Sequence, residues 1–347
     1  MGRVKREASS NLFFVMYDFG LNRVAEDILR MKAANVALQL PEGLKPYALS
    51  IAKELEAKTG SRIFILADPC YGGCDVAIDE AKRLRVDLLI HFGHSEMLKG
   101  LEIPVIYVES FMDLALNKVI KDSLNLLKGS RIGVVSIIQH STRLKEAIEV
   151  LKEAGKEVRV APPLGRVKYP GQVLGCDYSS AKSIADEVDS FLFIGGGVMH
   201  PLGVRIVTRK PVVAADPLTG KVEDVEQRYR RLISIRMTKI AEASNAKIFG
   251  VVLGLKPGQL RPQLADRLTE ELTKHGKRTF LLACREVTPS IEASFSEVEV
   301  FVITACPLIP LFDQEAYHKP LLTPQEALLA VKGGCQSLEE YEPFKWF

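Results

Sequence analysis

One order of elements recurs three times along this chain: an apolar run, a polar loop, an amphipathic helical pattern and another apolar run. This alternation is typical of parallel sheets whose faces are covered by helices. The apolar runs span 36–40, 63–66, 88–90 and 105–108, then 132–135, 158–160, 191–194 and 212–214, then 249–253, 279–282 and 300–303. Helical patterns cover 44–55, 76–84, 142–151, 180–187, 225–243, 260–274 and 324–331. We therefore expect an α/β protein.

Because each repeat has about 100 residues, we interpret the chain as an internal triplication. The predicted fold is three similar α/β domains with parallel sheets arranged around a pseudo-threefold axis. The expected domains are residues 1–112, residues 113–217, and residues 218–347 with a C-terminal tail. The same order of elements also fits one large doubly wound sheet with variable loops.

Composition and charge exclude several classes of partner. The 347 residues carry a net charge of only +3, so nothing demands a nucleic acid or an anionic membrane. No apolar run approaches the roughly 18–20 residues of a membrane span, and residues 12–17 are too short for a secretory signal. We expect a cytoplasmic protein without direct nucleic-acid or membrane contacts. Four arginines of the 225–243 helix, Arg228, Arg230, Arg231 and Arg236, are expected to form a solvated face.

Six cysteines in a cytoplasmic chain are not expected to form a disulfide framework. Each repeat places at least one thiol where an apolar run ends, and parallel strands bring such ends to one edge. These thiols are Cys70 and Cys74, Cys176, and Cys284 and Cys306, while Cys335 lies in the tail. If the repeats pack around an axis, three thiolates converge, and thiolate is the ligand that iron–sulfur clusters take. The alternative is that each lone cysteine is a small buried hydrophobic residue.

A set of ordered motifs adds a resemblance to a known family. The motifs are residues 38–44, Tyr71-Gly72-Gly73-Cys74, residues 91–95, Leu174-Gly175-Cys176, residues 195–200, Ala215-Asp216-Pro217, residues 250–254 and Ala305-Cys306-Pro307. Together they resemble the diphthamide-synthesis family. The resemblance implies three α/β domains that each supply one cysteine ligand, here Cys74, Cys176 and Cys306, to a 4Fe–4S cluster with one open iron. It leaves Cys70 as a bystander, requires no cysteine at 284 and does not reach Cys335.

The resemblance also implies the chemistry. A reduced cluster gives one electron to S-adenosylmethionine, and a 3-amino-3-carboxypropyl radical adds to imidazole C2 of a histidine in translation elongation factor 2. Methylthioadenosine is the other product. The implied partners are that elongation factor, an electron donor of unknown identity and a second copy of the chain in a homodimer.

Polar residues at strand ends are the remaining candidates. Gln39, Glu42, Gln139, Gln259, Gly195 and Gly197 are candidates for binding S-adenosylmethionine, with His140 and Lys256 at equivalent positions. Turn and cap chemistry explains several of them equally well. His91 and His200 are candidate acid–base groups, with His94 beside them, because a proton must leave the imidazole carbon. Each of these histidines could instead be satisfied within a loop network.

Two other functions compete with this prediction. A quinolinate-synthase-like enzyme also has a triplicated α/β fold with three cluster cysteines, but catalyses a condensation with dehydration. A non-catalytic, cluster-bearing subunit is the second alternative. The ordered motifs favour the diphthamide family, and a cysteine in every repeat argues against the non-catalytic subunit.

Overall fold

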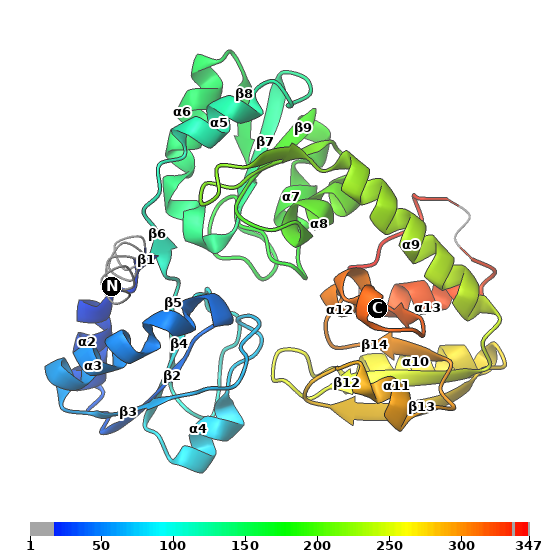
Figure 1. The fold of residues 1–347 in the computed structure, drawn as a ribbon, viewed down its shortest axis with the longest axis horizontal. Helices are drawn as coiled ribbons and strands as arrows, with labels where there is room; N and C mark the ends of the chain where they lie inside the picture. Colours follow the sequence, from blue (N-terminus) through cyan, green and yellow to red (C-terminus); the bar gives the residue numbers. More distant parts are fainter. Residues whose placement is uncertain (1–16, 335–336, 346–347) are drawn as a thin grey trace, which may run out of the picture.

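Three lobes surround a common centre in the fold (Figure 1). A computed structural model describes residues 17–334 and 337–345, so Cys335 lies outside the described residues. The chain passes from the first lobe, drawn in blue and cyan, to the green second lobe and then to the yellow and orange third lobe. Each lobe contains one main sheet.

The first lobe holds a parallel sheet in the order β3-β2-β4-β5. Its strands are β2 (Asn35–Gln39), β3 (Arg62–Ile65), β4 (Leu88–Phe92) and β5 (Val105–Val108). The helices are α2 (Leu21–Arg30), α3 (Ala48–Thr59), α4 (Ile78–Leu84) and a 3-10 turn, η1 (Glu42–Tyr47). Apolar residues of α2 recur at positions 21, 24, 25 and 28, so one face of that helix is buried. A short antiparallel pair, β1 (Tyr17–Asp18) and β6 (Phe111–Met112), precedes and follows the sheet.

The second lobe has the order β11-β10-β9-β7-β8, and only β11 runs antiparallel to its neighbour. Its strands are β7 (Arg131–Ser136), β8 (Glu157–Val160), β9 (Ser190–Ile194), β10 (Val212–Ala215) and β11 (Val222–Asp224). The helical segments are α5 (Asn117–Ser123), η2 (Ile138–Arg143), α6 (Leu144–Glu153), α7 (Ser179–Ser183), η3 (Ala185–Glu187) and α8 (Met199–Thr208). Every residue of β9 is buried, as expected for a strand covered on both faces.

The long helix α9 (Glu226–Ser244) leads from the second lobe to the third (Figure 1). The third sheet has the parallel order β13-β12-β14-β15, formed by β12 (Ile248–Gly254), β13 (Arg278–Cys284), β14 (Val300–Ile303) and β15 (Leu321–Leu322). Its helical segments are α10 (Pro262–Lys274), α11 (Ser290–Ser294), α12 (Leu308–Phe312), η4 (Gln314–Ala316) and α13 (Pro324–Val331).

The three sheets share one topology. When the strands of each main sheet are numbered along the chain from β2, β7 and β12, the first four always lie in the order 2-1-3-4. This repetition confirms the predicted α/β fold with three parallel sheets, and the single large sheet was the wrong alternative. The domain boundaries stay a prediction. Since β11 pairs with β10, we propose that the second boundary lies after Asp224 rather than after Pro217.

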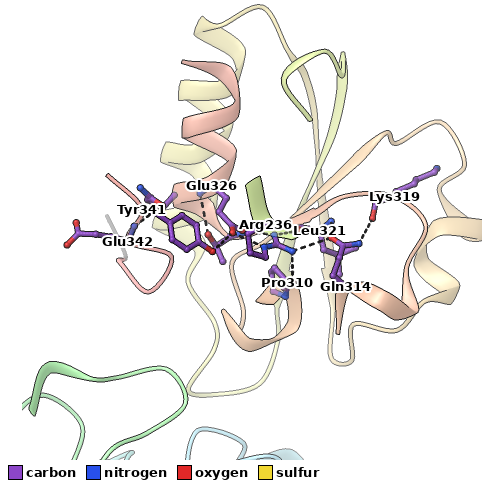
Figure 2. Close-up of polar contacts among 10 residues, drawn as sticks. Arg236, Pro310, Gln314, Lys319, Leu321, Glu326, Tyr341 and Glu342 are labelled. Atoms are coloured by element: carbon purple, nitrogen blue, oxygen red, sulfur yellow. Dashed lines mark hydrogen bonds and ion pairs between the residues drawn. The ribbon is translucent and has the colours of Figure 1, made fainter. Parts of the chain in front are cut away.

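A buried ion pair fixes α9 to the end of the chain (Figure 2). Arg236 is fully buried, donates from Nε and Nη2 to the two carboxylate oxygens of Glu326 at 2.9 and 2.7 Å, and also donates to the carbonyl of Pro310. Glu326 caps α13 through Thr323 and accepts the hydroxyl of Tyr341 at 2.8 Å. Arg236 is therefore an internal anchor, not part of the solvated face that the sequence suggested.

The other three arginines of that face are exposed and paired with carboxylates. Arg228 pairs with Glu223, Arg230 with Glu226, and Arg231 with Glu315. Among the described helices, none is both long enough and apolar enough to cross a membrane.

Candidate functional site

Cys74 lies in the loop between β3 and α4. The loop turns tightly: the amide of Asp75 donates to the carbonyl of Gly72 at 2.9 Å, and a side chain at Gly73 would approach the carbonyl of Ser95 to 3.0 Å. The carboxylate of Asp75 is buried and pairs with Lys256 of the third lobe at 3.0 Å. This ion pair fixes the residue next to Cys74 to another lobe.

Cys176 lies in the long loop between β8 and α7 of the second lobe. Asp177 shapes this loop, because its carboxylate accepts the backbone amides of Arg166 at 2.8 Å and of Ser179 at 3.0 Å. Nη1 of Arg166 then lies 3.8 Å from Sγ of Cys176. The loop thus brings a guanidinium to the thiol.

Cys306 follows β14 of the third lobe, where the chain turns into α12. Arg261 holds this segment by donating to the carbonyls of Thr304 at 3.1 Å and Ala305 at 2.7 Å. The same segment contacts the second lobe: a side chain added at Gly175 would lie 2.5 Å from Leu308. Residues 175 and 308 are neighbours of Cys176 and Cys306.

The three thiols converge at the centre between the lobes. The amide of Gly258 donates to the carbonyl of Cys74 at 2.8 Å, and Nε2 of Gln259 lies 3.4 Å from its Sγ. Burial raises the pKa of Cys306 to about 12, and the charges of Cys176 and Cys74 add to this shift. Burial also raises the pKa of Cys176, again with a contribution from Cys74. Such mutual influence requires thiols that are close together.

Two arginines supply positive charge to this centre. Burial lowers the pKa of the Arg261 guanidinium, as does Arg166 beside it, whereas the charges of the three cysteines raise it. Three cysteines that can bind as thiolates are suitable ligands for an iron–sulfur cluster. The two guanidiniums beside them would offset the negative charge of such a cluster. Sequence reasoning missed both arginines. Their positions, two residues after Gln259 and within the loop of Cys176, were the available signals.

The glutamines at strand ends link loops to one another. Nε2 of Gln139 donates to the carbonyl of Gly93 at 2.8 Å and so joins the second lobe to the first. Gln259 joins the third lobe to Cys74, and buried Gln39 donates to the carbonyl of Asp75 at 2.7 Å. Glu42, by contrast, is exposed and pairs with Lys45 at the first turn of η1.

Two glycines and two histidines lie at the corresponding edge of the second sheet. Gly195 and Gly197 have φ of 152° and 78°, values that favour glycine. His200 on α8 is partly exposed and stacks on Phe193, with ring centroids 5.9 Å apart; burial lowers its pKa to about 4. His140 is buried, and its Nδ1 has no hydrogen-bond partner among the described residues.

His91, Cys70 and Cys284 lie outside the centre where the three thiols converge. His91 is fully buried, with Nδ1 2.9 Å from Oε1 of Gln39 and Nε2 2.9 Å from Nδ1 of His94. Cys70 is buried near these two rings. Cys284 is half-buried at the end of β13, where burial and Glu286 raise its pKa.

Comparison with known proteins now adds to this geometry. The family model described as "putative diphthamide synthesis protein" matches residues 40–342. The 2-(3-amino-3-carboxypropyl)histidine synthase of Pyrococcus horikoshii is 38% identical over 332 residues, which are 94% of this chain and 93% of that protein. Subunit 1 of the human 2-(3-amino-3-carboxypropyl)histidine synthase is 32% identical over 91% of this chain and 72% of its own length.

The fold has a solved counterpart as well. The crystal structure of Dph2 from Pyrococcus horikoshii with a 4Fe–4S cluster superimposes with a TM-score of 0.85 at 37% identity, covering 94% of this chain and 93% of that one. A second crystal structure of the same protein agrees equally well, with the same TM-score. The family model matches most of the chain, and the fold is that of the Pyrococcus protein. The chain therefore belongs to the diphthamide-synthesis protein family.

Proposed function

We propose that this chain is a 2-(3-amino-3-carboxypropyl)histidine synthase whose 4Fe–4S cluster is held by Cys74, Cys176 and Cys306. The convergence of these three thiols from three separate sheets carries the proposal. Similar proteins support it: one is a 2-(3-amino-3-carboxypropyl)histidine synthase, and the matching crystal structure contains a 4Fe–4S cluster.

When bound, the cluster would supply the single electron that cleaves S-adenosylmethionine and frees the 3-amino-3-carboxypropyl group. The residues of the chain set its surroundings. Arg166 and Arg261 offset the negative charge of the thiolates, and Gln259 donates a hydrogen bond toward the sulfur of Cys74. Hydrogen bonds and positive charge near such sulfurs raise the reduction potential of a cluster.

S-Adenosylmethionine is the proposed cosubstrate. Of the candidate residues, Gly197 is the most available, because it is exposed and a side chain there would meet no atom within 4 Å. Gly195 is buried, and a side chain there would lie 3.0 Å from Ile137. The side-chain amides of Gln39, Gln139 and Gln259 already bond protein atoms, so we assign them to holding the loops in place. Glu42 is exposed and serves as a turn residue.

The acceptor is proposed to be a histidine of translation elongation factor 2. Of the two candidate histidines, only His200 is partly exposed, so it is the one that an incoming imidazole could approach. Its pKa of about 4 makes it a weak proton acceptor near neutral pH. His91 cannot reach an incoming protein, since it is fully buried with both ring nitrogens engaged. We further propose a cytoplasmic homodimer reduced by a separate electron donor.

Anaerobic reconstitution with iron and sulfide tests this function. The reduced protein is incubated with S-adenosylmethionine and elongation factor 2, and the products are analysed by chromatography and mass spectrometry. We expect methylthioadenosine and an elongation factor heavier by one 3-amino-3-carboxypropyl group on a histidine. An elongation factor lacking that histidine is the control. A reconstituted cluster without either product would favour the non-catalytic subunit and overturn the proposal.

A further inference from the structure

Three potential metal ligands outside the cluster cysteines lie together in the first lobe. Sγ of Cys70 and one ring nitrogen each of His91 and His94 all lie within 4.8 Å of one another. Cys70 is 4% exposed and His91 is 0% exposed, whereas His94 is partly exposed. They come from two adjacent segments, the loop after β3 and the end of β4.

The backbone at the end of β4 brings the two rings together. Gly93, between the histidines, has φ of 83°, which a side chain would oppose, and a side chain there would come within 2.9 Å of Pro41. The resulting turn places the ring of His94 5.0 Å from that of His91. The geometry therefore depends on glycine at this one position.

The hydrogen bonds of Gln39 fix the tautomer of His91. Nε2 of Gln39 donates to the carbonyl of Asp75, and its Oε1 accepts the amide of Ala77 at 3.1 Å. The group facing Nδ1 of His91 is therefore an acceptor, so Nδ1 carries the proton. Nε2 of His91 is then an acceptor, and it takes the hydrogen bond from Nδ1 of His94 at 2.9 Å. A histidine oriented in this way by its other nitrogen is the usual arrangement of a metal ligand.

We propose that Cys70, His91 and His94 form a second metal site, which binds one divalent transition-metal ion such as zinc. One thiolate and two imidazoles are a common donor set for this borderline ion, with water as a fourth ligand. Binding displaces the proton from the Cys70 thiol and moves the proton of His94 from Nδ1 to Nε2, so both nitrogens can bind the ion. Because Cys70 and Cys74 share one loop, the ion would tie the base of the cluster loop to β4.

The first test uses the reconstituted protein loaded with zinc and freed of excess metal. We expect one zinc per chain by elemental analysis, and at least about tenfold weaker zinc binding in Cys70→Ser and in His94→Ala. The visible absorption of the cluster should persist in Cys70→Ser. Cys284→Ser is the matched control and should bind zinc like the unchanged protein. Equal zinc binding in Cys70→Ser and the unchanged protein would overturn the proposal.

The second test removes the proposed cluster ligands, because free thiolates also bind metal ions. In the variant Cys74→Ala/Cys176→Ala/Cys306→Ala, we expect cobalt(II) to give a thiolate-to-cobalt charge-transfer band. Adding Cys70→Ser should abolish that band. If the triple variant melts like the unchanged protein but shows no band, the site does not exist. If the triple variant does not fold, the zinc content of Cys70→Ser decides alone. Neither test depends on transferase activity.

Discussion

The third lobe contains two cysteines, Cys284 and Cys306, that could each be the third cluster ligand. Cys284 ends the second strand of its sheet, and Cys74 and Cys176 also follow second strands, so symmetry alone would favour Cys284. The thiol of Cys306, however, feels the charges of Cys176 and Cys74, whereas Glu286 and Lys256 act on Cys284. We expect Cys306→Ala, and equally Cys74→Ala or Cys176→Ala, to lose the visible cluster absorption after anaerobic reconstitution.

In the same measurement Cys284→Ala should keep full absorption and iron content, which makes it the matched control. A cluster that survives Cys306→Ala but not Cys284→Ala would assign the third ligand to the second strand and contradict the proposed centre.

Buried histidines make the stability of the protein depend on pH, and His140 is one of them. Burial lowers the pKa of His140 to about 4, with Asp216 opposing the shift. Its pKa in the unfolded chain is about 6.5, so the unfolded state binds the proton first as pH falls. The free energy of unfolding should therefore fall from about pH 6.5 and level off below about pH 4, by up to about 3 kcal/mol from this group. Urea titrations across this range would measure the slope.

His140→Leu should reduce that slope by the share of one group, because leucine does not titrate whereas His94 and His200 still do. Its effect near pH 7 should be small, since Nδ1 of His140 has no described partner to lose. An unchanged slope in His140→Leu would mean that other groups cause the acid sensitivity.

The best predicted elements were those with strong local patterns. The runs expected at 105–108 and 300–303 are strands β5 and β14, and the pattern at 324–331 is α13. Helix α5 escaped prediction because a distant residue caps it: Glu146 accepts the amides of Leu116 and Asn117. Helix α8 was hidden by glycine, since Gly203 lies so close to Tyr178 that a side chain would clash at 2.0 Å. Both helices depend on tertiary contacts that no local window contains.

The pairing of helix α9 with α13 yields a prediction about stability. Both Arg236 and Glu326 have fully buried side chains, so removing one partner leaves an uncompensated charge. We expect Arg236→Met to destabilise the protein by about 3–5 kcal/mol. Chemical denaturation followed by circular dichroism would measure the loss.

The double variant Arg236→Met/Glu326→Gln should be more stable than Arg236→Met, because glutamine removes the buried charge and can still accept hydrogen bonds at the cap of α13. Arg230→Met is the matched control: its pair with Glu226 is largely exposed and should contribute less than about 1 kcal/mol. Equal losses in Arg236→Met and Arg230→Met would show that the internal anchor is unimportant.

The arrangement of the three lobes in the whole molecule explains which parts of the site could be predicted from the sequence. The ordered motifs single out the three cysteines proposed as ligands, and the common sheet order explains why their loops lie at corresponding edges of the three sheets. Arg166 and Arg261 were missed, and the partner of Lys256 could not be predicted, because Asp75 lies in another lobe. Gln139 and Gln259 were predicted to bind a ligand, and their side-chain amides contact another lobe, which only the relative placement of the sheets reveals.

The first and third lobes approach each other closely at Gly258. A side chain there would lie 2.6 Å from Cα and Cβ of Cys74 and 2.8 Å from its carbonyl oxygen. Backbone atoms cannot move aside without a large cost in free energy. Gly258→Ala should therefore push the third lobe away from Cys74 and break the hydrogen bond from the amide of residue 258 to the carbonyl of Cys74. Since each lobe has its own sheet, the melting temperature should change little, whereas iron content and cluster absorption after reconstitution should fall severalfold. Gly43→Ala is the control, because a side chain at 43 meets no atom within 4 Å. A full cluster in Gly258→Ala would mean that the thiols do not need the close approach of these two lobes.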